Sequence, residues 1–310
     1  ADPDTTPKSI YISTYTSAPL DADFQFLLKN HKEEFQIGID ILNNLVENPV
    51  VLSVDSAFPG FFEKIKGVKI LRIKGPHPAG NVSIQIHKHM PINIGEKVWE
   101  VRPEDVVNIG KLFTDGQYSS QRTVAVAGES VLQPQYIKTK IGSLITSITD
   151  VTGFDNTRQN RFINGDVLSG KAEALEGHLD FYNNNLTIIP EGNEYRMFGW
   201  LPFVDNRIPS LSKTSLSWLF GSKGYSVDTN MNGEERAFVV TGEMEKVFPM
   251  EIYPMQLLKA CMAGDIEKME ALGIYEVIPE DFGLIDYANT SKIEAQQIIK
   301  EGIELMIKEV

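Results

Sequence analysis

The residues with the clearest potential for chemistry lie in one short loop. The loop consists of Gly75, Pro76, His77, Pro78, Ala79 and Gly80, and it follows an apolar run typical of a buried strand. A helical pattern begins directly behind it, so the loop is expected at the carboxyl edge of a sheet, where open α/β sheets bind ligands. Two glycines would let a flat or anionic group approach the backbone there. The alternative is a proline-braced loop that only redirects the chain.

Three histidines, His77, His87 and His89, raise a second possibility, a freestanding metal-dependent hydrolase. On a helix, positions i and i+2 point about 200° apart, so His87 and His89 could not hold one ion there. On a strand they would share a face and could do so. The simpler interpretation is that the imidazoles are exposed or satisfied in the core.

Other catalytic signatures are missing from the sequence. The turn after Ile12 contains no glycine, so the dinucleotide-binding fingerprint of a dehydrogenase is absent. No serine lies in a Gly-x-Ser-x-Gly elbow. The single cysteine, Cys261, lies among apolar residues near a predicted helix end, a setting that does not activate a thiol. One cysteine also excludes a disulfide framework within the chain and fits a reducing compartment.

Net charge and hydrophobicity further limit the kinds of partner that the chain can bind. The 310 residues carry a net charge of −13, which repels nucleic acid and anionic lipid headgroups. No apolar run approaches the roughly 20 residues of a membrane-spanning helix, and the N-terminus lacks the order of a signal peptide. We therefore expect no nucleic acid partner and no membrane span.

The first part of the chain has the pattern of an α/β domain. Apolar runs at 9–15, 50–54 and 68–73 alternate with helical patterns, which predicts a parallel, doubly wound sheet over residues 1–118. Pro103 is expected to open the last helix of this domain, at the first helical position that proline favours.

The rest of the chain divides into three further segments. Short strands and turn residues predict a small β-grasp-like domain over 119–192. Residues 193–250 are rich in glycine, serine and asparagine and are expected to form an irregular or β segment that packs on the other domains. They include an aromatic group that could cover a hydrophobic ligand or a partner, although core filling is the commoner role: Phe198, Trp200, Phe203, Trp218 and Phe220. Residues 251–310 are expected to be helical, with Asp265 capping one helix and Ser291 and Glu294 forming a capping box for the last.

Several motifs resemble one protein family along almost the whole chain. They are the 75–80 loop, Pro103–Phe113, Asn164–Gly170, Phe198–Trp200 and Glu245–Met250. In this order they resemble the A subunit of the sodium-translocating NADH:quinone reductase. The family's N-terminal part, which resembles a lipoyl-carrier or barrel-sandwich domain, is missing. A strand-like run that starts almost at the first residue likewise suggests a truncated chain.

The resemblance implies a role in a sodium-exporting pump of the bacterial inner membrane. The complex passes electrons from NADH through flavins and iron–sulfur centres of other subunits to quinone. This chain would be a peripheral component on the cytoplasmic side, without flavin, cluster or metal, that docks on the B and C subunits, of which B lies in the membrane, and is not catalytic alone. It is also a candidate for binding ubiquinone or menaquinone, with His77 and the backbone N–H groups of Ala79 and Gly80 as donors to the quinone oxygens.

The resemblance extends to the C subunit of the Rnf complex and the flavin-binding subunit of respiratory complex I. It implies a Rossmann-like domain, a soluble-ligand-binding β-grasp domain and a C-terminal helical domain. The Rnf relative carries a run of cluster-binding cysteines after a segment like Ala271–Tyr275. Here the corresponding residues, 277–290, contain no cysteine, whereas a cluster needs about four thiolates.

Overall fold

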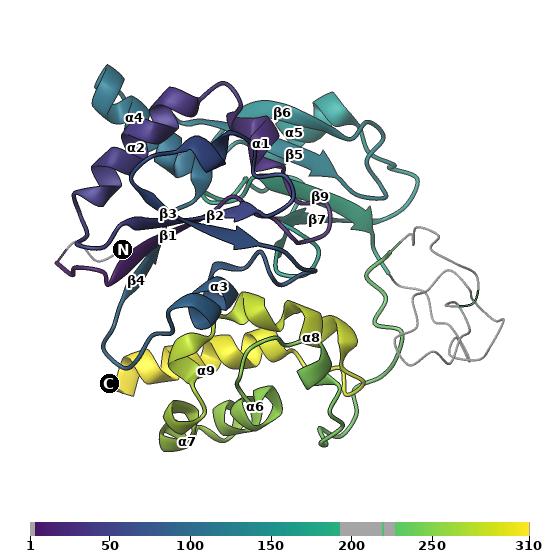
Figure 1. Cartoon of the computed structure of the whole chain (residues 1–310). Helices are drawn as coiled ribbons and strands as arrows, with labels where there is room; N and C mark the ends of the chain where they lie inside the picture. Colours follow the sequence, from purple (N-terminus) through teal and green to yellow (C-terminus); the bar gives the residue numbers. More distant parts are fainter. Residues whose placement is uncertain (1–3, 193–218, 220–226, 310) are drawn as a thin grey trace.

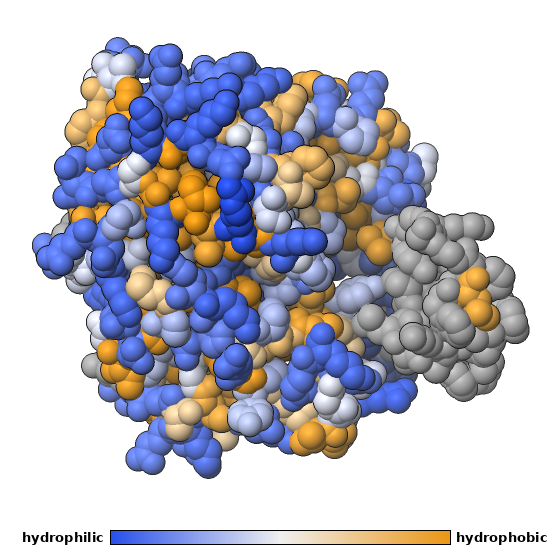
Figure 2. All heavy atoms as spheres, viewed as in Figure 1, coloured by the Kyte–Doolittle hydropathy of each residue, from blue (hydrophilic) through white to orange (hydrophobic). Residues whose placement is uncertain are grey.

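The computed structural model describes residues 4–192, 219 and 227–309, which form a parallel sheet with its helices, a second mixed sheet and a set of C-terminal helices (Figure 1). The Phe198–Trp200 motif and the aromatic group from Phe198 to Phe220 lie outside the described residues. Hydrophilic residues cover most of the face shown in Figure 2, with hydrophobic residues gathered in patches between them. Within the described ranges, no helix is both long and apolar enough to cross a bilayer.

The first sheet is parallel, as the alternating pattern predicts. Its strands lie in the order β3-β2-β1-β4 and are β1 (Ser9–Ser13), β2 (Val50–Asp55), β3 (Val68–Ile73) and β4 (Val98–Glu100). Every residue of β1 is buried, as are the first five of β2, because helices cover both faces. Strand β4 was not predicted from the sequence, because three residues are too few to show the two-residue alternation of a strand.

Two long helices cover one face of this sheet and α3 (Val82–His89) covers the other (Figure 1). The long helices, α2 (Lys32–Asn43) and α4 (Pro103–Asp115), approach each other through glycines. A Cβ on Gly110 would lie 1.9 Å from the Glu34 carbonyl oxygen. The two backbones therefore touch where a side chain would not fit. The short helix α1 (Phe24–Leu28) and the 3-10 turn η1 (Gly60–Lys64) complete this part.

The second sheet is mixed. Its strands lie in the order β6-β5-β9-β7-β8, with β5 and β9 parallel and the other pairs antiparallel. The elements of this part are β5 (Gln121–Ala127), β6 (Gln135–Lys140), α5 (Ile145–Thr152), β7 (Asn160–Asn164), β8 (Lys171–Glu173) and β9 (Asn185–Pro190). The three-residue strand β8 was not predicted from the sequence.

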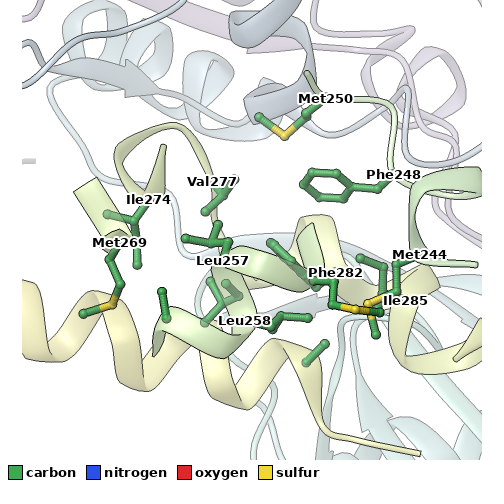
Figure 3. Packing of buried hydrophobic residues seen from close by; sticks show 14 of the residues in the cluster. Met244, Phe248, Met250, Leu257, Leu258, Met269, Ile274, Val277, Phe282 and Ile285 are labelled. Carbon is green, nitrogen blue, oxygen red and sulfur yellow. The ribbon is translucent and has the colours of Figure 1, made fainter. Parts of the chain in front are cut away.

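The C-terminal part is helical, as expected. Its helices are α6 (Pro254–Ala263), α7 (Ile266–Ala271), α8 (Gly283–Ala288) and α9 (Ala295–Glu309), joined in part by the 3-10 turns η3 (Met244–Lys246), η4 (Ile274–Glu276) and η5 (Pro279–Phe282). They enclose a core of methionine, leucine, isoleucine and phenylalanine side chains (Figure 3). Val277, Phe282 and Ile285 lie in this core, so the stretch 277–290 builds structure.

One predicted helix cap is confirmed and one is wrong. The Asp265 carboxylate accepts the Lys268 N–H at the start of α7, as expected. The predicted capping box of α9 does not form, because residues 291–294 are not helical and Lys292 has a left-handed backbone with φ 55°. Ser291 Oγ donates to the Ala237 carbonyl. The first N–H of α9, from Ala295, is accepted at 2.5 Å by Asp286 of α8. A carboxylate at this position accepts the N–H and also interacts favourably with the positive end of the helix dipole, whereas a hydroxyl carries no charge.

Candidate functional site at the carboxyl edge of the parallel sheet

The 75–80 loop lies at the carboxyl edge of the parallel sheet, directly after β3 and before α3. The segment that follows β1 fastens it on one side. Tyr15 Oη donates to the Gly75 carbonyl at 2.5 Å, and the Gly80 N–H donates to Ser17 Oγ at 2.8 Å. A Cβ on Gly80 would lie 2.6 Å from Ser17 Oγ, so glycine is required for this close approach.

Helix α3 fastens the loop from behind. Gln85 Nε2 donates to the carbonyls of Ala79 and Gly80, at 3.2 Å each, and to Ser13 Oγ at 3.0 Å. The Gln85 side chain is buried, so these bonds form away from bulk water and hold the loop firmly. The loop is thus a braced turn with a fixed shape.

This bracing corrects one expectation from the sequence. The Ala79 N–H donates to the Pro76 carbonyl at 3.0 Å, and the Gly80 N–H is taken by Ser17. Both backbone donors that we expected to reach a quinone oxygen are therefore already used within the chain. The loop folds back on itself through a tight turn, which sequence spacing does not show.

The His77 ring is oriented by Ser17. Ser17 Oγ lies 3.2 Å from His77 Nδ1 and accepts the Gly80 N–H, so its own hydroxyl proton can be donated to Nδ1. We assign the imidazole proton to Nε2 from this network. Nε2 is buried and has no hydrogen-bond partner among the described residues. Burial lowers the pKa of His77, which favours the neutral ring.

The other two histidines turn away from His77. His89 Nδ1 lies 2.6 Å from Tyr11 Oη, beneath the sheet. His87 Nδ1 lies 2.7 Å from a Glu276 carboxylate oxygen, and its Nε2 accepts the Glu251 N–H at 3.0 Å. In the described part of the chain, no three His, Cys, Asp or Glu side chains are placed to hold a metal ion. The metal-dependent hydrolase has no support in this geometry.

The mixed sheet adds polar residues that sequence analysis missed. Asp21, after β1, accepts Asn185 Nδ2 of β9 at 2.6 Å, and burial raises the pKa of Asp21. Asp166 lies close enough to oppose the effect of burial on the pKa of His77. Its carboxylate is held by the Leu168 and Ser169 N–H groups. Asp166 lies within the Asn164–Gly170 motif, which was the feature of the sequence that could have pointed to it.

The C-terminal part closes the other side of the site. The Asp281 carboxylate is almost fully buried and accepts Ser83 Oγ at 2.5 Å and Asn81 Nδ2 at 3.2 Å, at the start of α3. Burial raises the pKa of Asp281. The site therefore lies where three parts of the chain meet. It offers one buried N–H donor to a neutral acceptor, and the described residues around it include no activated nucleophile.

Comparison with known proteins shows to which family the chain belongs. Residues 1–118 match the family model of the NqrA second alpha/beta domain, and residues 123–174 match that of the NQRA C-terminal domain. The A subunit of the Na(+)-translocating NADH-quinone reductase from Alcanivorax borkumensis is 34% identical over 304 residues, which is 97% of this chain and 67% of the relative. The chain belongs to the NqrA family.

Other NqrA proteins give similar values. The Yersinia pestis relative is 34% identical over 301 residues, 96% of this chain and 66% of the relative. The Pseudomonas aeruginosa relative is 33% identical over 303 residues, 97% of this chain and 67% of the relative. The chain thus spans about two thirds of the length of these curated relatives.

Two solved structures of an NAD+-reducing [NiFe]-hydrogenase are also similar. The air-oxidized state gives a TM-score of 0.47 at 12% identity, and the H2-reduced state gives 0.45 at 11%. Each match covers 97% of this chain and 55% of the hydrogenase chain. Scores this low carry no conclusion about this NqrA chain.

The one cysteine of this NqrA chain is not activated as a nucleophile. Cys261 is a free thiol in α6, and burial raises its pKa to about 11. A thiol with this pKa is almost wholly protonated at neutral pH, so it is a poor nucleophile. The structure agrees with the sequence analysis on this point.

Proposed function

We propose that the chain acts as the A subunit within the Na+-translocating NADH–quinone reductase complex and contributes to quinone reduction without a redox group of its own. The observation that carries this proposal is the 33–34% identity over 96–97% of the chain to proteins that bear this name. The partners are the other subunits, with the B and C subunits in contact, on the cytoplasmic side of the bacterial inner membrane. The isolated chain would not catalyse the reaction.

We assign four segments to this protein. Residues 1–118 form a Rossmann-like domain, supported by the parallel order β3-β2-β1-β4 with helices on both faces. Residues 119–192 form a β-grasp-like domain; counted from β5, its strands lie in the order 2-1-5-3-4. Residues 193–250 connect this domain to the helical domain, 251–310. The three folded segments meet around the 75–80 loop.

Quinone binding belongs, in this proposal, to the 75–80 loop. A quinone carbonyl is a neutral acceptor, and the buried Nε2–H of His77 is a neutral donor without a partner among the described residues. Satisfying a buried polar group contributes about 1–3 kcal/mol. Because Ala79 and Gly80 use their N–H groups within the loop, His77 alone takes the donor role.

Titration of the full protein with a short-chain ubiquinone tests this assignment. We expect saturable binding that His77→Ala weakens about tenfold, by loss of one hydrogen bond. His178→Ala, which removes an exposed imidazole elsewhere, should leave the affinity unchanged. Absence of saturable binding, or equal affinity in the His77→Ala protein, would reject the loop as the quinone site.

A further inference from the structure

Helix α4 presents two distinct faces. Pro103, Val106, Val107 and Gly110 are buried. Asp105, Asn108, Ile109 and Leu112 follow the same 3.6-residue period on a second face, and that face lines a groove of about 490 Å³. The volume is in the range of small-molecule sites. This groove is separate from the 75–80 loop.

Aromatic side chains form the opposite side of the groove. Tyr118 follows α4, and Phe181 and Tyr182 come from the loop before β9 of the mixed sheet. The Phe181 and Tyr182 rings lie 4.8 Å apart at 76°, and about half of each side chain remains exposed. Because the two rings are nearly perpendicular, one of them can stack face to face on a flat ligand, which contributes about 1–3 kcal/mol.

Buried charges fix the position of these rings. The fully buried Arg122 side chain pairs with Glu104 at 3.0 Å and with Asp105 at 3.2 Å, both in the first turn of α4. The same guanidinium lies 6.0 Å from the Phe181 ring. Arg102 Nη1 donates to the Tyr182 carbonyl at 2.8 Å. The groove is therefore held in shape before any ligand binds.

The Asn108 side chain indicates what the ligand must offer. Asn108 is only 8% exposed and lines the groove, yet its amide makes no hydrogen bond to any described residue. The Asn108 amide atoms are not among the fully buried polar atoms, so they are reached from the groove, where an amide can pair with both an acceptor and a donor. A ligand edge with adjacent donor and acceptor atoms would satisfy it.

A carboxylate at the groove could accept amino groups. Glu100, Asp105 and Arg102 line the groove, and because Asp105 is paired with the buried Arg122, Glu100 is the carboxylate left to accept a donor. Carboxylates accept the exocyclic amino groups of bases, and asparagine pairs with the N6 and N7 edge of adenine. A quinone offers acceptors only and would leave the Asn108 carbonyl unmatched.

We propose that this groove binds a neutral adenine-type base, with Asn108 reading the polar edge of the ring, Tyr182 stacking on one face, and the nearly perpendicular Phe181 ring meeting the base edge-on. The site is independent of the quinone assignment, because none of the residues of the 75–80 loop lines the groove.

Adenosine is the probe, and calorimetric titration of the full protein measures its binding. We expect one saturable site, and an affinity about tenfold lower for inosine, which has an oxygen in place of the 6-amino group. Asn108→Ala and Tyr182→Ala should each weaken adenosine binding about tenfold. Phe58→Ala removes a ring that is 74% exposed outside the groove and should not change the affinity.

Four results would overturn the proposal. The first is the absence of saturable adenosine binding to the unmodified protein. The second is equal affinity for adenosine in the Tyr182→Ala protein, whose exposed substitution leaves the fold intact. The third is binding of a proline-rich peptide without any binding of adenosine, which would make the groove a peptide surface. Loss of binding in His77→Ala would also contradict it, since that residue belongs to the other site.

Discussion

At the scale of single residues, the site depends on side chains whose partners lie far away along the chain. His87 and Glu276 are 189 positions apart and yet bond at 2.7 Å. Asp281 reaches Ser83 over a similar separation. Sequence spacing predicted the position of the 75–80 loop, but it could not show that Ser17 would take the Gly80 N–H. It also gave no role to Asp21 or Asp166, since each acquires its environment only when the two sheets pack together.

Asp281 provides a test of this buried polar junction through pH. Burial raises its pKa in the folded chain above the unfolded value of about 4. The folded state therefore holds its proton more tightly. The stability contributed by Asp281 is present below the unfolded pKa and is lost as the pH rises through the folded pKa.

We expect Asp281→Asn to reduce the gain in unfolding free energy that the protein shows as the pH falls from about 7 to about 5. Urea denaturation across this range measures the difference. The reference variant is Glu304→Gln, which removes an exposed acid of α9, and we expect it to keep the pH profile of the unmodified protein. An unchanged profile in Asp281→Asn would mean that Asp281 does not titrate differently in the two states.

At the scale of elements, hydrophobic periodicity predicted the main strands and helices because their buried faces are long. The apolar runs of β1, β2 and β3 each cover five or six residues, whereas β4 and β8 have three. Such short strands are defined by their neighbours in the sheet. The start of α9 was misassigned for a related reason: its cap, Asp286, belongs to the preceding helix.

The two possible caps of α9 can be separated by substitution. Asp286→Ala should lower the unfolding free energy by about 1–2 kcal/mol, because it leaves the Ala295 N–H and the positive helix end unsatisfied. Glu294→Ala, which removes the exposed acid of the sequence-based capping box, should have little effect. Chemical denaturation of both variants measures this. If Glu294→Ala destabilised the protein more than Asp286→Ala, the capping box predicted from the sequence would be the cap of α9.

The contact between α2 and α4 gives a second test at this scale. Gly to Ala normally stabilises a helix interior by about 1 kcal/mol. In Gly110→Ala the new methyl group would lie 1.9 Å from the Glu34 carbonyl oxygen, which is backbone and cannot swing aside. We expect the helices to separate and the unfolding free energy to fall by about 1–3 kcal/mol.

Thermal unfolding of Gly110→Ala beside Lys111→Ala, the next residue of the same helix, measures this effect. The lysine substitution changes helix propensity without touching the α2 contact. A Gly110→Ala protein at least as stable as Lys111→Ala would show that the two helices do not approach as closely as described.

At the scale of the whole molecule, the resemblance seen in the motifs is confirmed by relatives that align along nearly the entire chain. The sequence predicted three kinds of structure in the right order: a parallel sheet, a mixed sheet and a helical end. How these parts meet was beyond prediction. Helix α3 lies between the parallel sheet and the C-terminal helices (Figure 1), and Asp281 and Glu276 attach it there.

The most direct test of the proposed function uses the complex. Membranes of a strain that lacks the gene for this protein should lose NADH-dependent quinone reduction, and returning the full-length protein should restore it while it co-purifies with the other reductase subunits. Unchanged quinone reduction without the protein, or its absence from the purified complex, would contradict its role as a component required for quinone reduction.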